Sequence, residues 1–113
     1  MLGNLLADLP EAGAEEVFTR ILRAPGLVVE RIVSTGQASP PGFFYDQPQD
    51  EWVLVLAGHA ALLFADEAEP RRLGPGDHLL IPARRRHRVE GTDRDPPTIW
   101  LALHFGPGLP ESP

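Results

Sequence analysis

The sequence predicts an all-β domain in which short strands close into a double-sheet jelly roll or barrel. Thirteen prolines and eleven glycines divide the 113 residues into short segments. After residue 20 no long stretch of helical periodicity runs without one of these breakers. Strands this short satisfy their edges best by wrapping into a closed double sheet. A chain of this length is expected to form one domain with one core.

The predicted elements begin with residues 4–16, whose composition is helical and whose Pro10 limits any helix to a turn or two. Residues 17–23 and 27–34 are rich in apolar side chains and form a predicted hairpin. Its turn is Ala24-Pro25-Gly26, with proline at the first corner and glycine where a positive φ is needed.

A loop with a brief strand near Phe43–Tyr45 is predicted over residues 35–50. The remaining predicted strands cover residues 51–57, 60–65, 77–82, 87–90 and 98–105. Residues 51–57 are almost continuously apolar, which predicts that both faces of that strand are covered. We expect residues 1–16 to form an N-terminal segment, residues 17–106 the barrel, and residues 107–113 a tail.

Charge and composition restrict the function. The formal net charge of −6 argues against a nucleic-acid-binding protein, because such a protein needs a basic face to neutralise phosphates. The absence of cysteine excludes disulfides and thiolate metal sites. No apolar stretch reaches the roughly 20 residues that cross a bilayer, and the N-terminus carries no export signal. We therefore expect a cytoplasmic protein that binds a small molecule and no membrane.

Two side chains stand out on predicted strands. Glu51 begins an otherwise apolar strand, so its carboxylate faces either water at the strand end or a polar partner inside. His87 follows the Pro75-Gly76-Asp77 turn and the apolar strand that ends at Pro82, on a hairpin that holds the imidazole against a sheet. By themselves, both side chains also fit ordinary positions at the rim.

The spacing of these residues resembles the cupin superfamily. Glu51, six residues and Gly58 match the second half of the motif G-x5-H-x-H-x3-4-E-x6-G. Gly76, Pro82 and His87 match the motif G-x5-P-x-G-x2-H-x3-N. The resemblance covers about residues 38–105 and implies a cupin jelly-roll barrel. Cupins include dioxygenases, isomerases, decarboxylases, lyases and plain binding domains, so it implies no single activity.

The sequence also departs from these motifs. The two histidines expected before the glutamate are absent, and their positions fall on Tyr45 and Gln47 or on Phe44 and Asp46, depending on the spacing chosen. Arg84 stands where a glycine is usual, and Gly91 where an asparagine is usual.

The resemblance implies a divalent transition metal, Fe, Mn, Ni or Zn, held by Glu51 and His87, with Asp46 or Gln47 as a third ligand. Tyr45 or His104 would then move protons. Counting by twos along the last strand places Trp100, Ala102 and His104 on one face, so His104 is either an interior ligand or a core histidine.

The run Arg84-Arg85-Arg86-His87-Arg88 has two interpretations. The simpler one is a solvated loop whose arginines pair with nearby carboxylates. In the other, Arg84 and Arg86 reach over the barrel mouth and bind a carboxylate or phosphate of the ligand.

Three functions follow as hypotheses. The first is a metal-dependent, dioxygenase-like enzyme acting on a small polar organic molecule. The second is a non-catalytic module that binds a small molecule, and the third is a sugar or sugar-phosphate isomerase. The resemblance also implies a homodimer, and the apolar strands 17–23 and 27–34 favour an edge shared between two chains.

Overall fold

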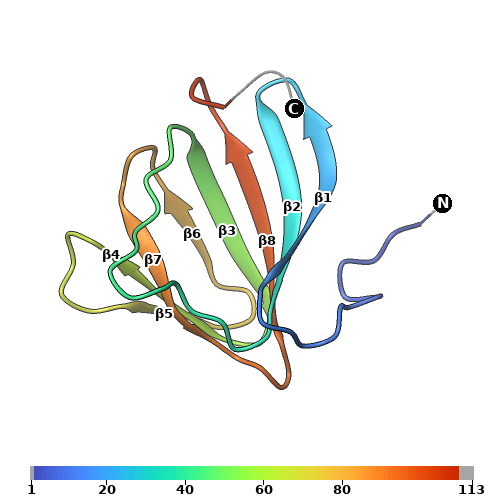
Figure 1. Cartoon of the computed structure of the whole chain (residues 1–113). Coiled ribbons are helices and arrows are strands. Elements are labelled where there is room, and N and C mark those ends of the chain that lie inside the picture. Colours follow the sequence, from blue (N-terminus) through green and yellow to red (C-terminus); the bar gives the residue numbers. More distant parts are fainter. Residues whose placement is uncertain (1, 110–113) are drawn as a thin grey trace.

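Eight strands form two antiparallel sheets in the computed structural model, which describes residues 2–109 (Figure 1). The larger sheet has the order β1-β2-β8-β3-β6, and the smaller sheet has the order β5-β4-β7. The strands are β1 (Val17–Ala24), β2 (Leu27–Ser34), β3 (Asp50–Ala57), β4 (Ala60–Phe64), β5 (Arg71–Leu73), β6 (His78–Ile81), β7 (His87–Thr92) and β8 (Thr98–Phe105). This confirms the predicted all-β double sheet.

Turn chemistry sets the hairpins. Ala24 pairs with Leu27 across the predicted β1–β2 turn, where Gly26 has a φ of 71°. In the turn before β6, Gly76 has a φ of 90° and donates its backbone N–H to the carbonyl oxygen of Val55 at 2.8 Å. Because that bond ties the turn to β3, β6 starts directly beside β3.

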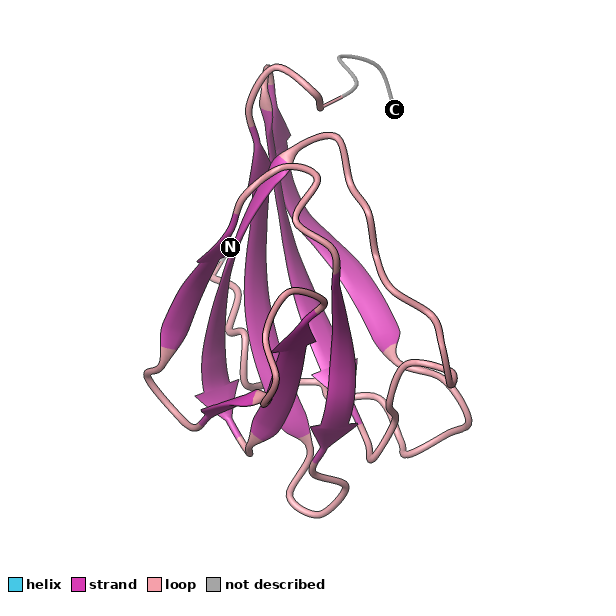
Figure 2. Cartoon of the chain, turned by 90° about the vertical axis from the view of Figure 1, so that its left-hand side faces the viewer, coloured by secondary structure: helices cyan, strands magenta, loops and turns pink. Residues whose placement is uncertain are grey.

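The prediction of a short N-terminal helix is wrong. The described residues contain strands and loops only, and therefore no helix that could span a membrane (Figure 2). The Arg31 guanidinium donates hydrogen bonds to the carbonyl oxygens of Leu5, Ala7 and Asp8. These oxygens therefore do not accept the backbone hydrogen bonds of a helix. Asp8 also has a φ of 53°, which no α-helix contains.

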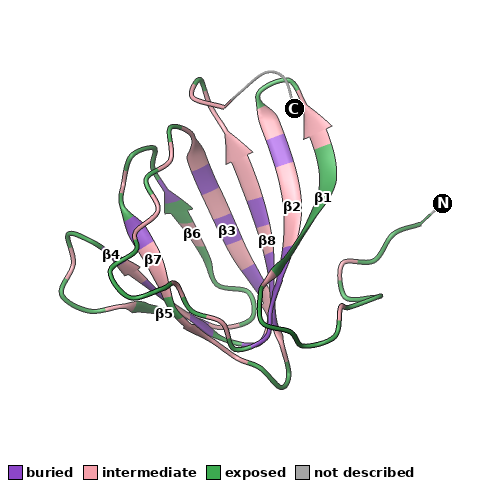
Figure 3. Cartoon of the chain, in the orientation of Figure 1, coloured by how far each residue is buried: buried purple, intermediate pink, exposed green. Residues whose placement is uncertain are grey.

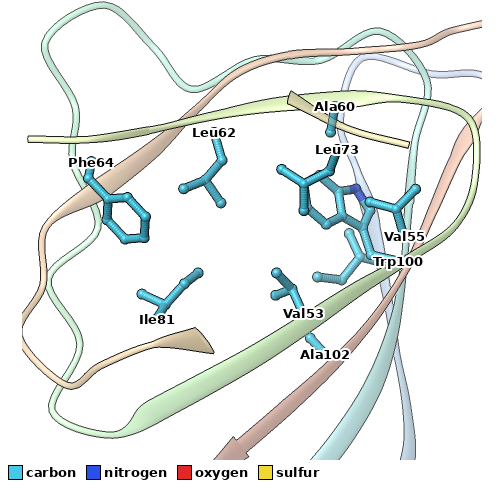
Figure 4. Close-up of a cluster of buried hydrophobic side chains, with 10 residues drawn as sticks. Val53, Val55, Ala60, Leu62, Phe64, Leu73, Ile81, Trp100 and Ala102 are labelled. Carbon is cyan, nitrogen blue, oxygen red and sulfur yellow. The ribbon is translucent and has the colours of Figure 1, made fainter. Parts of the chain in front are cut away.

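The core lies between the two sheets (Figures 3 and 4). Along β3, Glu51, Val53 and Val55 are buried, while Trp52 and Leu54 between them are only half-buried. The predicted coverage of both faces of this strand is therefore wrong. The larger sheet has a covered inner face and an outer face that is apolar yet accessible.

Two smaller features differ from the predicted elements. β5 was not predicted, because the two arginines among its three residues conceal the strand pattern. The brief strand expected near Phe43–Tyr45 is reduced to one antiparallel bridge between Tyr45 and His87. That bridge nevertheless positions Tyr45 for the site.

Gly58, in the turn between β3 and β4, is expected to be intolerant of a side chain. Its φ is 72°, and an added Cβ would lie 2.6 Å from the Pro97 carbonyl oxygen. We expect Gly58→Ala to lower the free energy of unfolding by about 2–5 kcal/mol, measured by urea denaturation. Gly26→Ala is the matched control, because Gly26 has nearly the same φ and no atom within 4 Å. A loss of only about 1–2 kcal/mol is expected there, and equal losses at the two positions would contradict the steric explanation.

Candidate active site

The register of the larger sheet brings two predicted site residues together. Glu51 on β3 pairs with His104 on β8, which also pairs with Val28 on β2. Trp100 and Ala102, the predicted neighbours of His104 on one face of β8, are buried in the core. The count by twos is therefore confirmed, and His104 lies on the inner face beside Glu51.

His87 reaches the same place from the smaller sheet. It begins β7, pairs with Phe64 of β4, and stacks on the Tyr45 ring at a centroid distance of 5.4 Å. Its Nδ1 lies 2.9 Å from the Arg85 carbonyl oxygen, which can only accept, so Nδ1 carries the proton. The Nε2 atom makes no hydrogen bond to the described residues and is the ring nitrogen that can bind a cation.

Glu51 lies between the two imidazoles. Its Oε1 is 3.9 Å from His87 Nε2, and its Oε2 is 3.9 Å from His104 Nε2. Only 9% of the Glu51 side chain and 5% of the His87 side chain are exposed. Both distances are too long for hydrogen bonds. The buried carboxylate is thus within ion-pair distance of both rings but forms no hydrogen bond with either.

Amide side chains connect this carboxylate to His104. Gln47 Nε2 donates to Glu51 Oε1 at 3.1 Å, and Gln49 Nε2 donates to Gln47 Oε1 at 2.7 Å. Gln49 Nε2 also lies 3.4 Å from His104 Nδ1, and His104 Nε2 lies 2.9 Å from Glu30 Oε1. A continuous polar chain therefore runs from Glu51 to Glu30.

The side chains of Glu30, Gln47, Glu51, His87 and His104 line a cavity of about 230 Å³ inside the barrel. Its polar and charged lining includes three carboxylates and two imidazoles, and its apolar lining includes two aromatic rings besides Tyr45. No arginine is among the lining residues, which are Glu16, Phe18, Glu30, Ile32, Tyr45, Gln47, Glu51, Val53, Leu62, Ile81, His87, Val89, Trp100 and His104. The cavity therefore favours a positively charged or neutral occupant over an anion.

Tyr45 holds its proton tightly. Burial raises the pKa of its phenol above the ordinary value of 10.0, and the carboxylates of Glu16 and Glu51 raise it further. The hydroxyl is therefore protonated at neutral pH and available as a hydrogen-bond donor.

The structure separates the predicted site residues into two groups. Tyr45 and Gln47 line the cavity with Glu51, His87 and His104, so the shorter of the two motif spacings describes this chain.

Asp46, Arg84 and Arg86 do not line the cavity. Asp46 pairs with Arg84 at 3.3 Å on the surface, and the Arg86 guanidinium lies over the Phe44 ring at 5.1 Å. The expectation that Arg84 and Arg86 grip a ligand at the mouth therefore finds no support in their placement. Arg84 has a φ of 65°, which explains why the motif usually has glycine there.

Sequence reasoning missed three residues of the site. Glu30 shares the inner face of β2 with Val28 and Ile32. A carboxylate between two apolar residues of the same face could have indicated a polar site inside the barrel. Gln49 had no signal beyond its closeness to Glu51. Glu16 precedes β1 in a segment expected to be helical, so no strand pattern indicated its direction.

The donor set fits a metal ion in its chemistry. His87 Nε2 and Glu51 are buried, face one cavity, and have the imidazole and carboxylate character that Fe, Mn, Ni and Zn prefer. Within residues 2–109, however, no three histidine, aspartate or glutamate side chains are grouped as a metal site. The Gln47 side chain lies next to Glu51, since its Nε2 donates to Glu51 Oε1 at 3.1 Å.

The contacts of His104 predict a pH-dependent stability. Burial alone would lower its pKa, but the hydrogen bond to Glu30 and the charges of Glu51 and Glu30 outweigh burial and raise the pKa above 6.5. The folded chain then binds more protons than the unfolded chain between pH 6.5 and the raised pKa. In metal-free protein this contribution to stability is complete below pH 6.5 and is lost as the pH rises through the raised pKa.

Urea denaturation with a chelator at several pH values measures this contribution. We expect His104→Gln to flatten the decline of stability above pH 6.5, and His59→Gln, at an exposed histidine paired with Asp93, to leave it in place. Parallel pH profiles for wild type and His104→Gln would contradict the assignment.

Comparison with known proteins gives a family. Residues 30–104 match the family model described as "Cupin domain". A crystal structure of a "putative mannose-6-phosphate isomerase" from Ralstonia eutropha is 51% identical, with a TM-score of 0.89, and the match covers 93% of this chain and 97% of that one. A cupin superfamily protein from Desulfitobacterium hafniense, 21% identical with a TM-score of 0.71 over 90% and 88% of the two chains, shares the fold.

The chain is also similar to a dimethylsulfoniopropionate lyase from Ruegeria pomeroyi. The two are 40% identical over 70 residues, which are 59% of this chain and 33% of the lyase. The crystal structure of that lyase has a TM-score of 0.62 and 27% identity, over 95% of this chain and 55% of the lyase. The chain thus matches only about a third of the length of this curated relative.

Proposed function

The chain belongs to the cupin domain family, and on that premise we propose that its barrel binds one divalent transition-metal ion and a small organic molecule. Glu51 and His87 hold the ion, and Gln47 completes the protein ligands once its amide group turns, so that the oxygen that now accepts from Gln49 faces Glu51 instead of the nitrogen. The observation that carries this proposal is a buried carboxylate 3.9 Å from a buried imidazole nitrogen that no described residue binds. Ligands of one ion with bonds of about 2.1 Å lie up to about 4.2 Å apart, so this separation is compatible with a shared ion.

We propose that the reaction is a proton transfer. A bound ion would polarise a substrate oxygen as a Lewis acid. Tyr45 keeps its phenolic proton and donates a hydrogen bond to the ligand, while the 2.9 Å pair of His104 and Glu30 takes up or releases a proton beside the ligand. The names of two relatives, an isomerase and a lyase, denote reactions without net oxidation, which favours acid–base chemistry over the dioxygenase alternative.

The lining also bears on the substrate. A sugar phosphate requires a cationic partner for its phosphate, and the cavity has carboxylates but no arginine on its wall. An unphosphorylated substrate is therefore favoured over the sugar-phosphate alternative. The alternative function, a non-catalytic binding module, uses the same cavity. It differs from the proposed enzyme only because it does not convert the bound molecule.

Metal analysis tests the proposal. Protein purified without chelators or added metal is expected to contain about one Fe, Mn, Ni or Zn ion per chain. After chelation, returning the preferred ion at about 100 times its Kd is expected to stabilise the fold by about 2.7 kcal/mol, measured as a rise in Tm. Occupancy below a tenth, together with no rise in Tm for any of the four ions, would overturn the metal assignment.

We also propose that two copies pair through the outer face of the larger sheet. One apolar row crosses all five strands on that face and consists of Leu22, Val29, Leu103, Trp52 and Leu80. Leu22 and Leu80, at its two ends, are 52% and 50% exposed. A solvated sheet face normally alternates to polar residues, so this row favours a buried contact.

A further inference from the structure

The mouth of the cavity is formed by Glu16, Phe18 and Tyr45. These three residues line both the barrel cavity and an adjoining outer groove, whose other wall includes residues 37–40. Because they border both spaces, a ligand that enters from the groove passes them before it reaches Glu51 and His87.

The Glu16 carboxylate is held in place by two buried side chains. Ser34 donates its hydroxyl to Glu16 Oε2, and Trp100 donates its indole N–H to Ser34 Oγ at 3.1 Å. Ser34 is fully buried and Trp100 is 3% exposed. Glu16 Oε1 accepts no hydrogen bond from the described residues. The carboxylate is thus fixed in direction and keeps one oxygen for another partner.

The charges in the cavity do not balance without a ligand. Glu16, Glu30 and Glu51 contribute carboxylates, and no arginine lies on the wall. A divalent ion at Glu51 and His87, together with the His104 imidazole that pairs with Glu30 at 2.9 Å, would still leave the Glu16 carboxylate without a cationic partner in the cavity.

Aromatic side chains line the cavity together with this carboxylate. Phe18 pairs with Ile32, which pairs with Trp100, so these side chains lie in one row on the inner face. Phe18 and Tyr45 line the mouth with Glu16. Aromatic faces attract cations, and aromatic cages are the sites that recognise quaternary ammonium groups.

We infer that the mouth, through Glu16 and the rings of Phe18 and Tyr45, recognises the positively charged group of a small organic cation of the quaternary ammonium or related onium class. The inference rests on the proposed function, because the other end of the ligand lies at Glu51 and His87.

Two probes of the same shape test the inference. Choline carries a quaternary nitrogen, and 3,3-dimethylbutan-1-ol has carbon in its place and no charge. Isothermal titration of both into metal-loaded and metal-free protein, at one ionic strength, gives the ratio of their Kd values. For the wild type we expect choline to bind about tenfold more tightly or better.

Two variants with the same change in charge locate the preference. Glu16→Gln is expected to reduce the ratio below about threefold, and Glu69→Gln, at an exposed position outside the cavity, to leave it unchanged. Equal Kd values for the two probes would overturn the inference. So would the absence of choline binding at about 10 mM, which is already a very weak affinity, or an equal loss of the choline preference in both variants. A choline preference in wild-type protein that binds none of the four metal ions would overturn the metal assignment and leave this inference standing.

Discussion

Replacing Glu51 by glutamine is expected to weaken binding of the preferred metal ion by about 100-fold or more, above the 10–100-fold that loss of an outer-shell partner costs. The variant keeps the shape of the side chain but removes the charge that opposes the cation. Glu51 is buried beside His87, so solvent cannot replace that charge. Competition of the ion against a chromophoric chelator measures the Kd.

Asp46→Asn is the matched control for Glu51→Gln. It removes one negative charge from the same loop-to-strand region, but its side chain pairs with Arg84 at the surface. Its Kd for the ion is expected to stay within about twofold of wild type, because exposed charges are well screened. If both variants bind as wild type does, Glu51 is not a ligand, and if both weaken equally, the effect is one of net charge.

The fold was predictable from the sequence because its signals are local. The Pro25-Gly26 and Pro75-Gly76 turns require the backbone conformations that glycine adopts, and the structure contains positive φ values at both glycines. The N-terminal segment was not predictable, since its carbonyl groups bind Arg31, a residue distant in sequence. Local propensity carries no information about such a partner.

The candidate site was predictable in part. Glu51 and His87 were found from motif spacing, and alternation along β8 indicated the direction of His104. The choice between Tyr45 with Gln47 and Phe44 with Asp46 needed the structure, because one residue of register reverses every side chain. The bridge between Tyr45 and His87 fixes that register, and no sequence pattern records it.

Replacing Leu80 by glutamate is expected to convert a dimer into single chains of 12.4 kDa, measured by size-exclusion chromatography with light scattering. The face consists of four strands of eight residues and one of four. With strands about 4.8 Å apart that rise about 3.3 Å per residue, its area is roughly 570 Å², somewhat below the ~800 Å² that each partner of a stable dimer buries. Leu80 lies at one end of the apolar row on this face. In a twofold arrangement the carboxylate introduced by Leu80→Glu therefore enters the interface twice.

Phe43→Glu is the control for the dimer test, because Phe43 is 42% exposed and lies outside the sheet. It is expected to keep about twice the mass of one chain, and circular dichroism checks that both variants remain folded. Leu22→Glu, at the other end of the row, is expected to dissociate the dimer as Leu80→Glu does. If Leu22→Glu alone dissociates it, the edge of β1 is the interface, as the apolar strands 17–23 and 27–34 predicted. A wild-type mass of one chain at micromolar concentration would overturn the dimer itself.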